Sequence, residues 1–216
     1  RRRGVAERIG APESHRFTHS LRGPPAAIGV GVRTVLSDDP RLTCRDGIGS
    51  SPTPVVFDTT LRTPPTAALF REHRRVVLVC DTAGAETEAK RYEESCATVV
   101  AVPAAASPDG LDRALRELYD AGIHSLMVEG GARLLRSFLV AGAYDLLAVT
   151  VAPRFLSGYR VGADQGLDVG VEFTDCFQLG ADLLLLGAPD RARSSAARSS
   201  AARSSARRSG GGGHRE

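Results

Sequence analysis

Short apolar runs alternate with helical segments along most of this chain, and that alternation constrains the fold more than any other feature. The apolar runs, several rich in Val and bounded by Gly, Pro or Asp, suit buried strands better than helices. The predicted strands are Ala26–Val30, Pro54–Phe57, Val76–Cys80, Thr98–Val102, Ser125–Val128, Leu146–Val151 and Asp182–Leu186. The predicted helices are Glu13–Leu21, Glu86–Ser95, Leu111–Ala121 and Ala132–Ala141. Repeated β–α–β units predict an α/β domain with a mostly parallel sheet.

The last two predicted strands depart from this alternation. No helical pattern separates Leu146–Val151 from Asp182–Leu186, and Phe155–Gly170 between them is rich in Gly and polar residues. We therefore expect an exposed excursion there, followed by C-terminal strands that join the sheet in the antiparallel sense.

The 216 residues divide into a folded part and a tail of different composition. Residues 1–188 contain all the predicted elements and are long enough for one domain. Within residues 189–216, the chain from Arg191 onward repeats Arg-Ser-Ser-Ala-Ala and has no apolar side chain larger than Ala. We therefore predict a disordered tail. An inert extension is favoured over Arg-mediated contact with nucleic acid or a membrane.

Composition argues against several classes of protein. The sequence has no run of about 18 apolar residues, so no membrane span is predicted. Aromatic residues make up 5% and Trp is absent, which argues against stacking platforms for single-stranded nucleic acid. The cysteines stand far apart without the spacing of metal ligands, so we expect free thiols, no metal and a cytoplasmic location. They are Cys44, Cys80, Cys96 and Cys176.

A Gly-Gly pair follows the predicted strand Ser125–Val128 and directly precedes the predicted helix Ala132–Ala141. The first amides of a helix lack intrahelical partners, and glycines let a phosphate approach them closely, so this unit suits a nucleotide pyrophosphate. Glu129 stands at the carboxyl end of the strand, where open α/β sheets bind ligands. A tight turn with a solvated Glu explains the same residues equally well.

A second group of polar residues surrounds the first predicted strand. Arg22 precedes it, Gly29 and Gly31 stand at its end, and Asp38-Asp39-Pro40 and Arg45 follow. Arginine suits a phosphate group, so these cations are consistent with a phosphorylated substrate. Ordinary turn chemistry and surface cations are the alternative. Neither a complete G-x-G-x-x-G fingerprint nor a P-loop is present.

Taken together, five motifs resemble the reductase family of riboflavin biosynthesis (the RibD C-terminal domain). The residues of these motifs are most similar to those of the stand-alone enzyme of fungi and archaea. The similarity extends from about Gly4 to Leu186. The motifs are Thr18-His-x-Leu-Arg22, the segment from Ala27 to Arg45, Pro54-Val-Val-Phe-Asp-x-x-Leu-Arg-Thr-Pro64, Val128-Glu-Gly-Gly-Ala-x-Leu135 and Ala152-Pro-x-x-Leu-x-Gly158.

The resemblance implies a three-layer fold similar to dihydrofolate reductase. It also implies a first strand whose usual sequence is missing ahead of residue 1, and homodimers formed through the sheets. The implied activity is the NADPH-dependent reduction of 2,5-diamino-6-ribosylamino-4(3H)-pyrimidinone 5′-phosphate to its ribitylamino form. Another oxidoreductase of the same fold, or a truncated copy that only binds nucleotide, remains an alternative.

The resemblance also assigns roles to individual residues. Cofactor-contacting positions are Thr34, Asp38, Thr59, Gly130, Gly131, Ala132, Arg133 and Leu134. Substrate-contacting positions are Arg22, Leu42, Arg45 and Glu129, with the arginines expected at the ribose phosphate. Asp38 and Glu129 are the carboxylates expected nearest the reacting carbon, where either is able to assist proton transfer.

Overall fold

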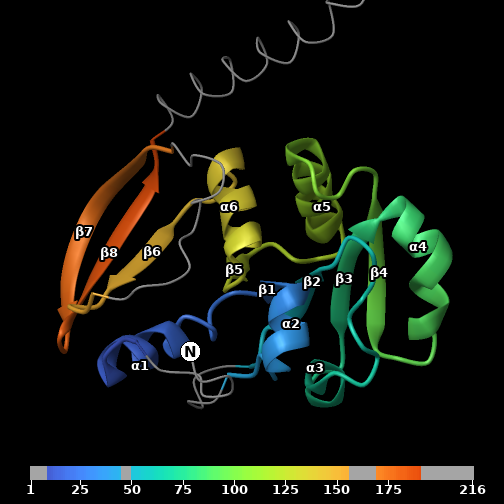
Figure 1. The fold of residues 1–216 in the computed structure, drawn as a ribbon, viewed down its shortest axis with the longest axis horizontal. Helices are drawn as coiled ribbons and strands as arrows, with labels where there is room; N and C mark the ends of the chain where they lie inside the picture. The colour runs from blue at the N-terminus through green and yellow to red at the C-terminus, as the bar shows by residue number, and fades with distance from the viewer. Residues whose placement is uncertain (1–8, 45–49, 156–168, 191–216) are drawn as a thin grey trace, which may run out of the picture.

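The structure is a computed structural model that describes residues 9–44, 50–155 and 169–190. Its central sheet is entirely parallel, with strand order β4-β3-β2-β1-β5. These strands are β1 (Ala27–Gly31), β2 (Thr53–Phe57), β3 (Val76–Asp81), β4 (Ala97–Val102) and β5 (Leu126–Val128). All five carboxyl ends therefore lie at one edge of the sheet (Figure 1).

Helices cover both faces of the central sheet. One face packs against α2 (Val32–Asp38), α3 (Ala68–Glu72) and α4 (Thr82–Glu88), which continues as the 3-10 helix η1 (Ala89–Tyr92). The other face packs against α5 (Pro108–Asp120) and α6 (Ala132–Ala141). Neighbouring strand residues such as Val77 and Leu78 point to opposite faces and are both fully buried. Burial of both faces explains why the strands are continuous Val-rich runs.

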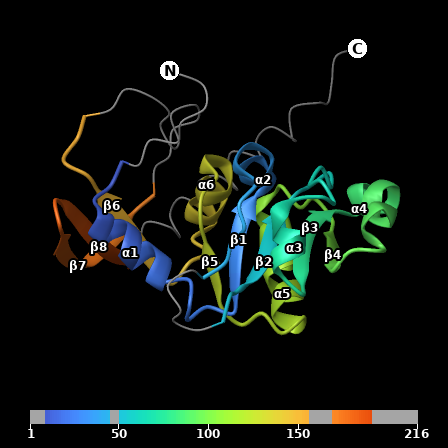
Figure 2. The same cartoon turned by 90° about the horizontal axis from the view of Figure 1, so that it is seen from below.

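A second sheet is antiparallel and has the order β6-β8-β7. Its strands are β6 (Leu147–Val151), β7 (Val171–Leu179) and β8 (Asp182–Pro189). Helix α1 (Pro12–Ser20) lies beside this small sheet, and Figure 2 shows it next to β6 and β8. The expected antiparallel sense is confirmed. These strands pair with one another, however, and no ladder joins β5 to β6 among the described residues.

Several sequence predictions need correction. Helices α2 and α3 and strand β7 were not predicted, and the expected helix Glu86–Ser95 is replaced by α4 and η1. Helix α4 begins earlier because Asp81 caps it, accepting a hydrogen bond from the Ala83 amide at 3.3 Å. The first strand implied by the resemblance, most of the excursion and residues 191–216 lie outside the described residues. Within the described ranges, no helix is long and apolar enough to cross a membrane.

Candidate functional site

The carboxyl ends of β1 and β5 bring two of the predicted segments together. The Glu129 amide donates a hydrogen bond to the Gly29 carbonyl at 2.9 Å, extending the ladder between these strands by one residue. Gly130 and Gly131 then turn the chain into α6 with φ angles of +70° and +85°. Both values lie in the left-handed region that side chains disfavour, so the turn requires glycine.

The Gly130-Gly131 turn faces the first turn of α2. A Cβ atom on Gly131 would lie 3.5 Å from Thr34 Oγ1 and 3.7 Å from the Gly31 amide nitrogen. The absence of a side chain therefore leaves a shallow cradle between Thr34 and the start of α6. No side chain in the described part of the chain caps the first amides of α6, which include those of Ala132 and Arg133. This cradle fits the phosphate groups of a nucleotide cofactor.

Arg22 and Glu129 form a two-pronged ion pair beside this cradle. Arg22 Nε donates to Glu129 Oε1 at 2.8 Å, and Arg22 Nη2 donates to Glu129 Oε2 at 2.6 Å. Their side chains are only 15% and 18% exposed, so solvent screens the pair less than a surface ion pair. Arg22 Nη1 also donates to the Thr43 carbonyl at 3.4 Å, which ties the pair to the segment after α2.

The remaining predicted residues of this region occupy different environments. Asp38 is exposed at the end of α2, one turn beyond Thr34 and on the same face of the helix. Asp39 has a structural role, because its carboxylate accepts the Ala68 amide at 2.8 Å and caps α3. Leu42 is buried in the core, so any contact with a ligand involves its main chain. Arg45 lies outside the described residues.

The other end of the same sheet edge contains two adjoining cavities. A cavity of about 540 Å³ lies between the carboxyl ends of β2, β3 and β4, where Thr59, Asp81 and Ser107 contribute to its lining. A second cavity of about 480 Å³ lies between the segment after β2 and helix α4. Thr60 and Gly84 line both. A Cβ atom on Gly84 would lie 2.7 Å from the Thr59 carbonyl oxygen, so glycine allows this close approach.

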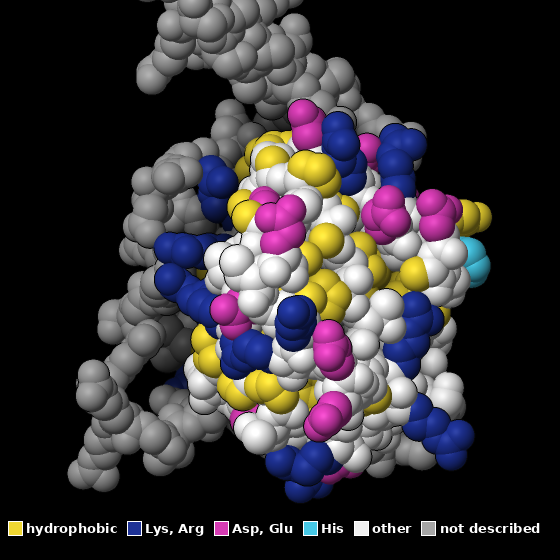
Figure 3. Space-filling view, turned by 90° about the vertical axis from the view of Figure 1, so that its right-hand side faces the viewer, with side chains coloured by type: hydrophobic (Ala, Val, Ile, Leu, Met, Phe, Trp, Pro, Cys, Tyr) yellow, Lys and Arg dark blue, Asp and Glu magenta, His cyan; other side chains and the backbone are white. Residues whose placement is uncertain are grey.

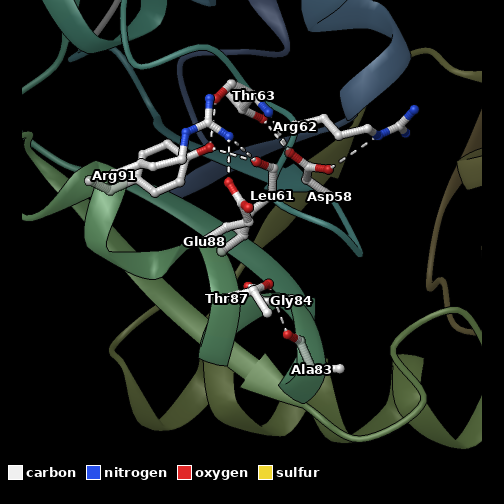
Figure 4. Close-up of polar contacts among 10 residues, drawn as sticks. Asp58, Leu61, Arg62, Thr63, Ala83, Gly84, Thr87, Glu88 and Arg91 are labelled. Carbon is white, nitrogen blue, oxygen red and sulfur yellow. Dashed lines mark hydrogen bonds and ion pairs between the residues drawn. The ribbon is translucent and has the colours of Figure 1, made fainter.

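Two arginines to which the sequence predictions gave no role, Arg62 and Arg91, line the second cavity (Figure 4). Arg62 Nε lies 4.0 Å from Asp58 Oδ1, and its side chain is half exposed. Arg91 donates to Glu88 at 2.9 Å and to the Leu61 carbonyl at 3.2 Å. Arg62 stands in the motif Leu61-Arg62-Thr63, which contributes to the family resemblance but for which no role in the site was predicted. That motif was the signal for this part of the site.

Buried hydrogen bonds hold the segment after β2 in place. Asp58 is fully buried, and its Oδ2 accepts from both the amide and the hydroxyl of Thr63 at 2.7 Å. The Tyr92 hydroxyl lies 2.6 Å from the Thr63 carbonyl and 3.1 Å from the Leu61 carbonyl. Burial raises the pKa of Tyr92 to about 12, so the hydroxyl remains a donor at neutral pH. The backbone that presents Thr59 and Arg62 is therefore firmly anchored.

Charges of both signs surround these cavities. Figure 3 shows the side of the molecule that carries α4, on which Lys and Arg side chains are interspersed with Asp and Glu. The Lys and Arg side chains on this face are therefore separated by acidic side chains and form no broad basic surface. Among the described residues, no group of three or more His, Cys, Asp or Glu side chains is arranged to hold a metal ion.

The cradle and the cavities lie along one edge because all five strands are parallel. From β5 to β3 the edge spans three inter-strand spacings, about 14 Å. Along this distance, phosphates at the Gly130-Gly131 turn and one nucleoside at the cavity that Thr59 lines would both fit, and the other nucleoside would lie on the Arg22–Glu129 side of the turn. The residues present thus fit a nicotinamide cofactor, and the Arg22–Glu129 pair lies at the cradle end.

The chain is similar to known proteins over most of its length. The chain matches the RibD C-terminal domain over residues 1–185. It is 33% identical over 189 residues to the 2,5-diamino-6-ribosylamino-4(3H)-pyrimidinone 5′-phosphate reductase of Methanothermobacter thermautotrophicus, covering 82% of this chain and 86% of that one. The corresponding reductase of Debaryomyces hansenii is 31% identical over 175 residues, with coverages of 71% and 68%.

A solved structure gives the same result. The riboflavin biosynthesis reductase of Saccharomyces cerevisiae superposes with a TM-score of 0.66 at 25% identity, covering 82% of this chain and 81% of that one. The expected fold class, similar to dihydrofolate reductase, is thereby confirmed. The chain belongs to the RibD C-terminal domain family, whose members include the pyrimidine reductases of riboflavin biosynthesis.

Proposed function

We propose that this chain reduces 2,5-diamino-6-ribosylamino-4(3H)-pyrimidinone 5′-phosphate to its ribitylamino form with NADPH. The observation that carries the proposal is the Arg22–Glu129 pair beside the Gly130-Gly131 turn, at one end of a dinucleotide-sized edge. The names of the archaeal and yeast relatives support the same substrate. The first test is oxidation of NADPH in the presence of this substrate, with dihydrofolate in a parallel reaction. Oxidation with dihydrofolate alone refutes the proposal.

The mechanism assigns different tasks to the two carboxylates. When bound, the cofactor supplies the hydride that reduces C1′ of the ribosyl group. Arg22 engages both oxygens of Glu129, so Glu129 acts as a fixed acceptor for amino groups of the substrate, and Arg22 also attracts the substrate phosphate. Asp38 is exposed to solvent one helical turn beyond Thr34, so we assign it the transfer of a proton from solvent to the ring oxygen as the bond between C1′ and that oxygen breaks.

The cradle and the cavities, at the two ends of the carboxyl edge of the central sheet, would bind different parts of the cofactor. Thr34, the Gly130-Gly131 turn and the first residues of α6, Ala132 to Leu134, would hold the pyrophosphate. Thr59 would contact the adenosine from the wall of the larger cavity. Arg62 and Thr60 in the neighbouring cavity would receive the 2′-phosphate that distinguishes NADPH from NADH.

This assignment predicts how Arg62 affects the choice of cofactor. In the variant Arg62→Gln we expect KM for NADPH to rise about tenfold while KM for NADH stays unchanged, because a half-exposed charged hydrogen bond is lost. Steady-state kinetics with both cofactors measures the ratio. Arg74→Gln, an exposed arginine before β3, is the matched control. Equal changes with the two cofactors would show that Arg62 does not read the 2′-phosphate.

The outer face of the small sheet supports the proposal of a homodimer. Val151 pairs with Leu183 across β6 and β8, so both side chains point to one face, and Phe173 of β7 lies on that face as well. Their exposed fractions are 44%, 45% and 48%. Apolar side chains gathered on one sheet face favour an interface with a second copy.

Light scattering after size exclusion tests the homodimer. We expect the unmodified chain to elute at twice its mass of 22.8 kDa and Leu183→Lys to elute as a monomer, because the new charge would be buried between the copies. Thr150→Lys, on the opposite face of the same sheet, should leave the dimer intact. A dimer that persists in Leu183→Lys would place the interface elsewhere.

A further inference from the structure

Helix α1 begins without a capping side chain of its own. Its N-cap residue is Ala11, whose side chain has no oxygen to accept the free amides of the first turn. Instead, the Ala11 amide donates a hydrogen bond to Asp182 Oδ2 at 2.7 Å. Asp182 is the first residue of β8 in the small sheet, 171 positions further along the chain.

The environment of Asp182 is closely fitted to this contact. The residue is 1% exposed, and a Cβ atom on Gly10 would lie only 2.9 Å from its Oδ2, so glycine is needed there. Two neighbouring groups lower the pKa of Asp182 and so favour its charged form. The Ser14 hydroxyl has the larger effect on this pKa, and the Ala11 amide has the smaller one. A negative charge at this position also interacts favourably with the dipole of α1.

The opposite end of α1 leads directly into the candidate active site. The helix ends at Ser20, and the Arg22 amide donates to the His19 carbonyl at 3.1 Å in the final turn. Arg22 then reaches Glu129 at the end of β5. Helix α1 therefore links the two sheets (Figures 1 and 2). Asp182 contacts the residue before its first turn, and Arg22 lies just past its last residue.

We propose that Asp182 is a positioning residue, which anchors the first turn of α1 and so holds Arg22 in register with Glu129. The kinetic part of this inference rests on the proposed function. The structural part does not, because it concerns only the contact between α1 and β8. Loss of the carboxylate frees the start of α1, and the displacement reaches Arg22 through a helix about 13 Å long.

Hydrogen exchange measured by mass spectrometry tests the anchor without substrate or cofactor. In Asp182→Ala we expect exchange in residues 11–22 to become about tenfold faster, while β1–β3 are unchanged. Asp182→Asn keeps an acceptor for the Ala11 amide and should restore part of the protection. Glu172→Gln, an exposed change on β7, is the control. Unchanged exchange in α1, or equal acceleration in both sheets, would overturn the inference.

Kinetics then test the consequence for Arg22. We expect Asp182→Ala to raise KM for the pyrimidine phosphate about tenfold and to leave KM for NADPH unchanged. A rise in KM for both would overturn the link to Arg22. If the unmodified chain does not reduce the pyrimidine phosphate, the proposed function fails, and the exchange result still decides whether Asp182 anchors α1.

Discussion

Replacing Arg22 with Met is expected to lower kcat/KM for the pyrimidine phosphate about 100-fold and to leave KM for NADPH nearly unchanged. The variant removes both hydrogen bonds to Glu129 and the cation assigned to the substrate phosphate. A hydrogen bond to a charged group contributes about 1.5–3 kcal/mol, which corresponds to about 10- to 150-fold. The effect falls on the substrate because Arg22 lies on the Glu129 side of the cradle. Steady-state kinetics with each substrate varied in turn measures it.

Two further variants make this result specific. Arg16→Met changes an arginine of α1 whose side chain is 70% exposed, and it should leave both KM values unchanged. Glu129→Gln should also lower kcat/KM for the pyrimidine phosphate. The loss of transition-state stabilisation in the double variant should be smaller than the sum of the two single losses, because the residues act as a pair. If Arg22→Met keeps the full kcat/KM, the ion pair has no role in binding or reducing the pyrimidine phosphate. Circular dichroism confirms that each variant is folded.

Asp38→Asn is expected to lower kcat about 100-fold. General acid–base catalysis contributes about 10²- to 10⁴-fold, and the amide cannot deliver the proton that ring opening requires. Because the amide keeps the size and an oxygen acceptor of the carboxylate, KM for NADPH should change much less than kcat. Single-turnover measurements separate the chemical step from product release.

The neighbouring residue supplies the control for Asp38. Asp39→Asn preserves an oxygen that accepts the Ala68 amide, so we expect unchanged kcat and at most a small loss of stability. Equal losses of kcat in the two variants would indicate damage to the end of α2. Full kcat in Asp38→Asn would exclude this carboxylate from proton transfer.

Most strands of the central sheet were predictable because each is specified by residues that are adjacent in the sequence. Runs such as Val76–Asp81 are buried on both faces, and the unit of β5, Gly130-Gly131 and α6 carries its own turn residues. Helix α3 was missed because it has only five residues and is capped from outside by Asp39. Strand β7 was missed because most of it is exposed and a bulge between Phe173 and Asp175 interrupts its alternation.

The site was less predictable than the strands because its key contacts join distant segments. Arg22 and Glu129 were named separately, but their pairing spans 107 positions and requires the folded sheet. The cavities at Thr59 and Arg62 exist only where the ends of β2 and β3 meet α4 and the segment after β4. Likewise, Asp38 and Asp39 are alike in sequence, and only the position of Ala68 gives Asp39 its structural role.

The most direct test of the proposed reaction follows the transferred hydrogen. The purified chain is incubated with 2,5-diamino-6-ribosylamino-4(3H)-pyrimidinone 5′-phosphate and NADPH carrying deuterium at both C4 positions of the nicotinamide, and the product is analysed by mass spectrometry and NMR. We expect a ribitylamino product with a single deuterium at C1′. A product without deuterium at C1′, or NADPH oxidation that does not depend on the pyrimidine phosphate, would contradict the proposed function.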